Sequence, residues 1–132
     1  MQLEEGPNDT EFEYREFGEE LALCQRYYEK SYDYKIFPGA TSSAGNVGGH
    51  SVNGTNQLFP VSYAVPKRVV PTTSLYSPAT GAVGAVRKDN SPADIASSPI
   101  YPGISGFGGV SMNTIPAVNN TIRYHYTSDA EL

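Results

Sequence analysis

The segment TIRYHYT, residues 121–127, carries the clearest strand pattern in this chain of 132 residues. Ile122, Tyr124 and Tyr126 share one face of an extended strand, and the polar residues between them share the other. We therefore expect a strand with one face on a hydrophobic core and one in a polar environment.

The same two-residue period appears in residues 58–65, LFPVSYAV. The odd-numbered residues are apolar or aromatic and are expected on one face, and Pro60 places this strand near a sheet edge. Further short strands are expected at about 73–76, 82–86 and 107–112, because turns rich in Gly, Pro, Asn and Ser separate these segments.

Residues 38–57 lack the side chains that a core needs. They hold five glycines, and their only large apolar residues are two valines, so the segment is predicted to be a loop. No helical pattern follows residue 35, which disfavours a parallel α/β fold. The sequence therefore predicts a mainly β protein with one N-terminal helix and an antiparallel β domain.

The one helix is predicted from about Gly18 to about Ser31, within the segment FGEELALCQRYYEKS. This segment has no proline, and two glutamates would lie in the first turn, where carboxylates stabilise the positive end of the helix dipole. Steps of four and three residues link a stripe of side chains over two heptads: Phe17, Leu21, Cys24, Tyr28 and Ser31. The stripe fits either a seam between chains or an ordinary amphipathic helix on its own domain, and the spacing does not choose between them.

The composition favours assembly over a self-sufficient monomer. Hydrophobic residues make up 39% of the chain, Trp is absent, and 13 glycines and 10 prolines leave little material for a dense core. The net charge of -5 argues against nucleic acid as a partner, because phosphate binding needs clustered Lys and Arg. No run reaches the roughly 18 apolar residues of a membrane span, and the single cysteine, Cys24, cannot close an intrachain disulfide.

The sequence supports no catalytic or metal site. The segment GISGF, residues 103–107, has phenylalanine where a nucleophile elbow needs its second glycine, so a turn is expected there. His50 and His125 have no Glu or Cys at ligand spacing, so each is expected to be a surface or packing histidine. We therefore expect a protein that is not an enzyme and that holds no metal or cofactor.

Five segments of the chain carry a resemblance that extends over nearly the whole chain except residues 38–57 and 88–106. They are QLEEGPNDTEFEYR at 2–15, FGEELALCQRYY at 17–28, VPKRVVPT at 65–72, LYSPATG at 75–81 and YTSDAEL at 126–132. Together they resemble the C-terminal region of bacteriophage tail fibre and related virion receptor-binding proteins.

The resemblance implies three parts and a homotrimer. Residues 1–16 would form an extended arm, the end of an upstream β-sandwich that is missing from this chain. Residues 17–35 would form a helical neck, and residues 36–132 an antiparallel β head, with upstream fibre domains as further partners. The trimer seam would consist of Phe17, Leu21, Cys24 and Tyr28.

The function that the resemblance implies is that of a noncatalytic tail fibre tip, carried on the virion and exposed to the extracellular medium. Loops of its head would bind a glycan or an outer-membrane protein of the bacterial surface, without nucleic acid and without insertion into the membrane. Receptor contacts are expected among polar and aromatic residues of the two variable stretches: His50, Asn53, Asn56, Asn90 and Tyr101.

Two alternatives remain open at this point. The first is a purely structural module that terminates a fibre or decorates a capsid and has no host ligand. The second is a depolymerase of surface polysaccharides, which is disfavoured because the β part offers no credible pair of acids.

Overall fold

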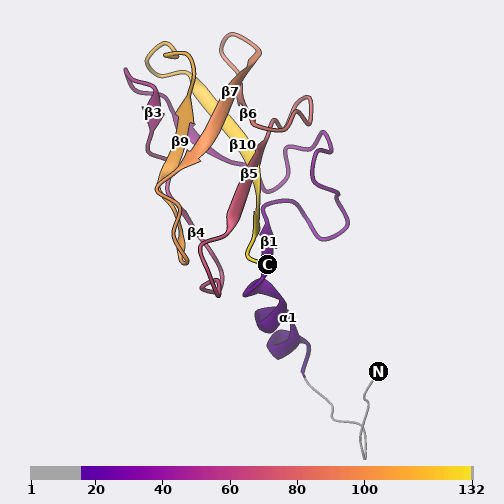
Figure 1. Ribbon diagram of the computed structural model, residues 1–132. Helices are drawn as coiled ribbons and strands as arrows, with labels where there is room; N and C mark the ends of the chain where they lie inside the picture. Colours follow the sequence, from indigo (N-terminus) through magenta and orange to yellow (C-terminus); the bar gives the residue numbers. More distant parts are fainter. Residues whose placement is uncertain (1–15, 132) are drawn as a thin grey trace, which may run out of the picture.

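The last strand, β10 (Thr121–Asp129), runs through the middle of the protein in the computed structural model, which describes residues 16–131 (Figure 1). Its first half pairs with β2 (Val47–His50) on one edge and with β6 (Ala85–Lys88) on the other. Its second half pairs with β1 (Tyr28–Lys30) and β5 (Thr72–Tyr76). All four pairings are antiparallel, so both edges of β10 are covered and its backbone groups find partners along most of its length.

The remaining strands extend the sheet away from β6. β7 (Ala93–Ile100) pairs with β6 through its first half and with β9 (Gly109–Met112) through its second half, and β9 pairs in turn with β3 (Asn56–Gln57). β4 (Val61–Ser62) and β8 (Gly106–Phe107) form a separate two-stranded sheet. These pairings are all antiparallel, so the predicted class, mainly β with antiparallel strands, is confirmed.

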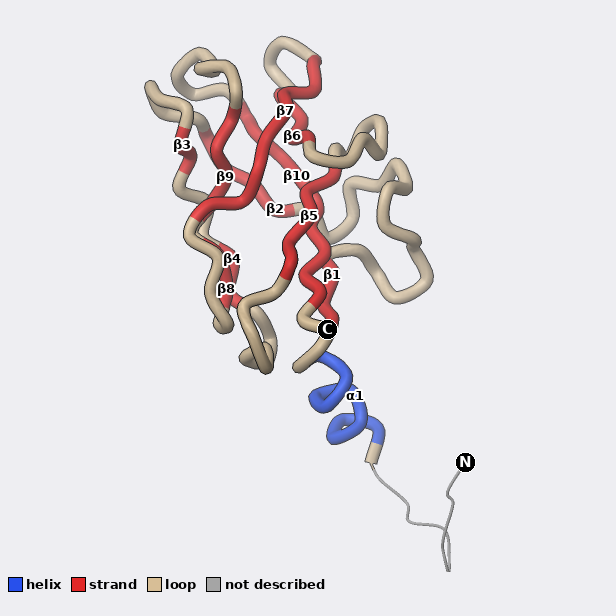
Figure 2. Tube along the Cα trace, viewed as in Figure 1, coloured by secondary structure: helices blue, strands red, loops and turns tan. Residues whose placement is uncertain are grey.

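One helix, α1 (Phe17–Gln25), projects from the end of the sheet at which β10 finishes (Figure 2). We call this end the base of the head and the opposite end, where β10 begins, the distal end. The predicted presence of an N-terminal helix is confirmed. The arm expected over residues 1–16 lies outside the described residues except for Glu16.

The hydrophobic core lies on the face of β10 that the sequence predicted. Ile122 and Tyr124 are fully buried, and Tyr126 is nearly so. The alternation of residues 58–65 also places Val61 and Tyr63 in this core, although only Val61–Ser62 of that segment forms a ladder. The other core residues are Leu75, Val86, Ile95, Phe107, Val110 and Met112.

The helix is shorter than predicted. It ends at Gln25, and Tyr28 belongs to β1, where it lies opposite Asp129. The neck expected over residues 17–35 is thus helical only at its start. The prediction extended the helix too far because Glu and Lys, which favour helices, flank the tyrosines. Tyrosines also favour strands, and here the residues after the helix pair with an edge of β10.

The loop predicted over residues 38–57 contains β2 and β3, which was not expected. Two glycines in β2 hide the strand pattern, yet the sheet needs them: a Cβ atom on Gly48 would collide with the carbonyl oxygen of Ile122 on β10. β7 was also missed, because its serines and its proline read as a variable loop. The strand expected at 107–112 is divided at Gly108, and the one expected at 82–86 begins only at Ala85.

Candidate functional site

Three of the five predicted receptor-binding residues meet at the distal end. His50 lies at the end of β2, opposite Thr121, and Asn53 follows in the next bend. The side-chain carbonyl of Asn90 accepts a hydrogen bond from the Thr121 N–H at 3.0 Å. The three side chains are exposed, and His50 and Asn90 flank Thr121, the first residue of β10. His50 is therefore a surface residue of a strand, where a loop had been expected.

The other two predicted residues lie elsewhere. Asn56 is the first residue of β3 and lies opposite Ser111 of β9. Tyr101 follows β7, has φ of 53°, and is 70% exposed. A Cβ atom on Gly108 would lie 2.9 Å from Cδ2 of Tyr101, so the missing side chain at Gly108 is what lets the ring rest there. The structure thus does not bring all five residues together at the start of β10.

A further loop, which holds none of the predicted receptor-binding residues, also lies at the distal end. Residues 113–120 connect β9 to β10 and fold around Ser51, which is 1% exposed. The Ser51 hydroxyl donates to the Ala117 carbonyl at 2.5 Å and accepts from the Asn120 N–H at 3.1 Å. The backbone of Ser51 also bonds to Asn119 and Asn120. The run of Pro and Asn before the last strand marked this segment as a turn, but nothing in the sequence tied it to Ser51.

The neighbouring turn is held by Gln57, which is fully buried in β3. Its side-chain amide donates to the carbonyls of Val52 and Gly54 at 3.1 and 2.5 Å, and its oxygen accepts from the Val52 N–H at 2.8 Å. We call the three segments 51–55, 89–92 and 113–120 the distal loops; Figure 2 shows them at the end far from α1. Because buried side chains fix two of them, they offer a surface of defined shape.

The carboxylates of Asp89, in the distal loop 89–92, and of Asp94, just after it, are hydrogen-bonded to neighbouring strands and turns. The guanidinium of Arg123 binds Asp89 with two hydrogen bonds of 2.5 and 2.8 Å, which holds the pKa of that carboxyl below its usual range. Burial alone would raise the pKa of Asp94, but hydrogen bonds from Thr80, Ser77 and Arg87 outweigh it and lower the pKa. Both carboxylates are thus ionised at neutral pH, and they accept hydrogen bonds that hold neighbouring segments together.

The predicted seam residues are open to solvent on one side of α1. Phe17 is 77% exposed, Cys24 is exposed, and no residue of α1 is buried. Tyr28 continues this surface from β1, so three members of the seam lie on the helix and one on the strand. Ser31, the last residue of the predicted stripe, instead turns its hydroxyl to His125.

A buried ammonium links the end of α1 to an ion pair at the base of the head. The Lys67 ammonium, whose side chain is wholly buried, lies 2.7 Å from a carboxylate oxygen of Glu29 and 2.6 Å from the Gln25 carbonyl oxygen. Glu29 also accepts from the Tyr126 hydroxyl at 3.2 Å and from the Ala64 N–H. Removing either charge would leave the other buried without its partner, at a cost of about 3–5 kcal/mol.

His125 lies on the face of β10 opposite the core, where residues 31–46 cover it. The Ser31 hydroxyl donates to its Nδ1 at 2.8 Å, and its Nε2 donates to the Ser42 carbonyl at 2.8 Å. The Tyr32 ring stacks on the imidazole with centroids 3.8 Å apart. Burial lowers the pKa of His125, although the Ser42 carbonyl and the charge of Asp33 raise it in part. His125 is therefore a neutral packing histidine.

Within residues 16–131, no group of three or more His, Cys, Asp or Glu side chains is placed to hold a metal ion. No helix in this part of the chain is both long enough and apolar enough to cross a membrane. No protein-family model, curated protein or solved structure matches the chain. The geometry of the distal loops and of α1 therefore provides the basis for a functional proposal.

The buried imidazole predicts a pH dependence of stability. Because the folded state favours neutral His125, the unfolded chain binds more protons below its own pKa of about 6.5. The free energy of unfolding should therefore fall between pH 7 and pH 5, by at most about 1.4 kcal/mol per pH unit. Urea denaturation across this range measures the effect.

Histidine substitutions separate this effect from other titrations. His125→Gln should remove the loss of stability on acidification, whereas His50→Gln, a change at the exposed histidine, should retain it. The depressed pKa values of Asp89 and Asp94 act mainly below about pH 5, outside this window. An unchanged pH dependence in His125→Gln would show that the imidazole is not its source.

Proposed function

We propose that this chain is the noncatalytic tip of a homotrimeric bacteriophage tail fibre, exposed on the virion, whose distal loops bind a receptor on the bacterial surface. The receptor would be a glycan or an outer-membrane protein. The resemblance of the five sequence segments to tail fibre proteins supports the class. The observation that carries the proposal is α1, an exposed helix with an apolar stripe at the end opposite the distal loops (Figure 1).

The length of α1 favours a partner. It has nine residues, whereas an isolated helix shorter than about 12–15 residues is marginal in water. None of its residues is buried within the described chain, and its N-cap makes no side-chain hydrogen bond. Packing against other copies would supply the burial that the helix lacks. Leu21 and Cys24 follow the heptad spacing that such packing uses.

The position of the distal loops suits the binding of a receptor. They project from the end of the head that assembly through α1 leaves free, and buried Ser51 and Gln57 fix their shape. Ile115 and Val118 of the longest distal loop are each 59% exposed, and His50 and Asn53 of the same end are exposed polar residues. Three such surfaces on one fibre would bind a repeating bacterial surface more tightly than one, by roughly 10²–10⁴ in apparent affinity.

A charge on the seam should dissociate the trimer. Leu21→Asp puts a carboxylate where apolar side chains of neighbouring copies would meet, so trimers should become monomers or insoluble protein. Ala22→Asp adds the same charge one position away from the seam and should leave trimers intact. Sedimentation equilibrium of both variants measures the result. A soluble Leu21→Asp trimer would contradict the proposal that Leu21 packs between the copies.

Receptor binding should depend on the distal loops. The double variant His50→Ala/Asn53→Ala should reduce binding of labelled trimers by about tenfold or more, since few contacts dominate most interfaces. The probes are an array of bacterial lipopolysaccharides and capsular polysaccharides, and intact bacterial cells. Val83→Ser, an exposed change between β5 and β6, is the control.

The alternative virion function has a distinct outcome in the same measurement. Intact trimers that bind neither the glycans nor any of the cells would favour a purely structural module that terminates a fibre or decorates a capsid. Cleavage of capsular polysaccharide by the chain would contradict the noncatalytic assignment.

A further inference from the structure

A groove of about 520 Å³ lies at the base of the head, between the end of α1 and the turn after β1. Leu21 and Cys24 line it from the helix, and Tyr28 and Tyr34 line it from β1 and the segment that follows. Tyr34 is 75% exposed and Tyr28 is 40% exposed, so two large rings border an open and mostly apolar space. The groove contains three of the four predicted seam residues.

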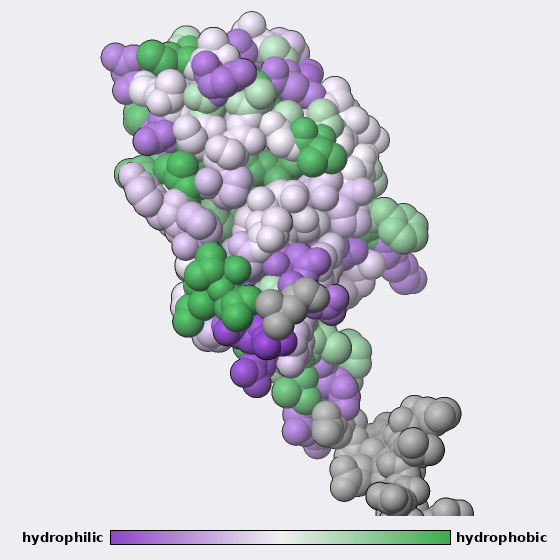
Figure 3. Space-filling view, in the orientation of Figure 1, coloured by the Kyte–Doolittle hydropathy of each residue, from purple (hydrophilic) through white to green (hydrophobic). Residues whose placement is uncertain are grey.

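A second apolar surface lies at the base of the head, and we call it the valine corner: Val69, Val70 and Ile104. Val70 is 55% exposed and Ile104 is 47% exposed, and Figure 3 shows apolar surface beside α1 at this end of the head. Backbone hydrogen bonds hold the corner in place. The Lys67 N–H donates to the Ile104 carbonyl oxygen at 2.7 Å, and the Arg68 N–H donates to the Arg26 carbonyl oxygen at 3.1 Å.

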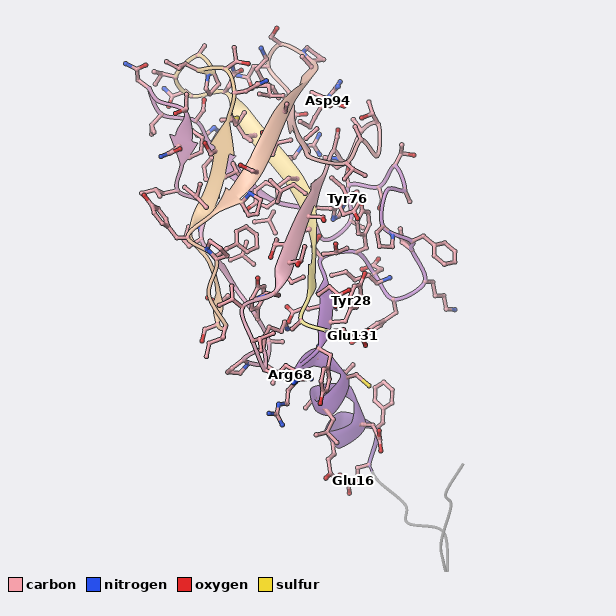
Figure 4. The ribbon with its side chains drawn as sticks, viewed as in Figure 1. Glu16, Tyr28, Arg68, Tyr76, Asp94 and Glu131 are labelled. Carbon is pink, nitrogen blue, oxygen red and sulfur yellow. The ribbon has the colours of Figure 1, made fainter. Side chains whose placement is uncertain are left out.

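The groove and the valine corner lie on different sides of the turn that links α1 to β1. The guanidinium of Arg68, next to the corner, lies 5.6 Å from the ring centroid of Tyr27, whereas the following residue, Tyr28, lines the groove. Tyr27 lies in the turn before β1, and neither Tyr27 nor any residue of the corner lines the groove. Figure 4 shows both Arg68 and Tyr28 at the end of the head that carries α1.

Two different apolar surfaces on one subunit fit a cyclic assembly. In a closed ring, each interface joins one surface of a copy to another surface of its neighbour. Charge is complementary at one point, because Arg68 borders the valine corner and Asp33 lines the groove. Of the other charged groups that line the groove, Glu29 is paired with Lys67, and the Lys30 ammonium donates to the carbonyl oxygens of Tyr34 and Ile36. Within residues 16–131 neither Arg68 nor Asp33 forms a salt bridge.

We propose that the groove of each copy receives the valine corner of the next copy, so that three copies form a closed ring that includes their three α1 helices. Val70 would enter beside Cys24, and Arg68 would approach Asp33 of the neighbour. This inference rests on the proposed trimer and specifies how its subunits meet. A seam of helices alone would instead bring the three Cys24 side chains together on the axis.

Cross-linking distinguishes the two arrangements, because the chain has a single native cysteine. Val70→Cys adds a thiol at the corner, and a short bismaleimide should then join Cys24 of one copy to residue 70 of the next, giving covalent trimers on denaturing gels. The wild type and Val70→Cys/Cys24→Ser, with one thiol each, should remain uncross-linked. Val118→Cys, equally exposed but at the distal end, is the matched control and should give no covalent trimers.

Sedimentation of the same samples separates this inference from the proposed trimer. Val70→Cys trimers that cross-link no more than the Val118→Cys control would overturn the groove packing and leave the trimer standing. Cross-linking of the wild type through Cys24 alone would also overturn it, in favour of the axial seam. A wild type that sediments as a monomer would overturn both.

A charge exchange tests the same interface without a new thiol. Arg68→Glu should weaken the trimer by roughly tenfold or more, because the same favourable contact is lost at each of three interfaces. Arg68→Glu/Asp33→Arg should recover most of that loss. A double variant no tighter than Arg68→Glu would contradict the pairing of these two side chains across the ring.

Discussion

The fold depends on the complete enclosure of one strand. β10 offers two edges and two faces, and segments from residues 28 to 88 cover both edges before β7, β9 and β3 extend the sheet. Its core face holds Ile122 and Tyr124, and its other face holds the buried His125. Because β10 lies near the C-terminus, each of its four pairings joins residues far apart in the chain. The sheet therefore has no central strand until the last part of the chain is in place.

Buried polar groups select one arrangement around this strand. His125 binds Ser31 and Ser42, and Glu29 binds Lys67 and Tyr126, so each group accepts or donates to residues of several segments. Within the described residues, no buried side-chain nitrogen or oxygen atom lacks a hydrogen-bond partner. Buried polar atoms destabilise a fold unless they are bonded, so other registers of β1 and β10 would leave these groups unsatisfied.

The sequence revealed those parts of the fold that depend on local pattern. The alternation in β10 and the buried Val61 and Tyr63 could be predicted, since side chains of a half-buried strand repeat every two residues. β2 could not, because Gly48 gives no pattern and is required only by the close approach of Ile122. At the candidate site, His50, Asn53 and Asn90 lie together, but the loop around Ser51 was missed. Its hydrogen bonds join residues more than sixty positions apart, and no local rule reports such contacts.

The helix and the head share one cluster of charges, and this has a consequence for the proposed fibre tip. The Lys67 ammonium binds the Gln25 carbonyl at the C-terminus of α1, where a cation interacts favourably with the helix dipole. The same ammonium binds Glu29, which also accepts a hydrogen bond from Tyr126 of the central strand. Rotating α1 relative to the head would therefore break the hydrogen bond from this buried ammonium to the end of the helix. In a trimer assembled through α1, the packing at the base would thereby fix the directions of all three distal surfaces.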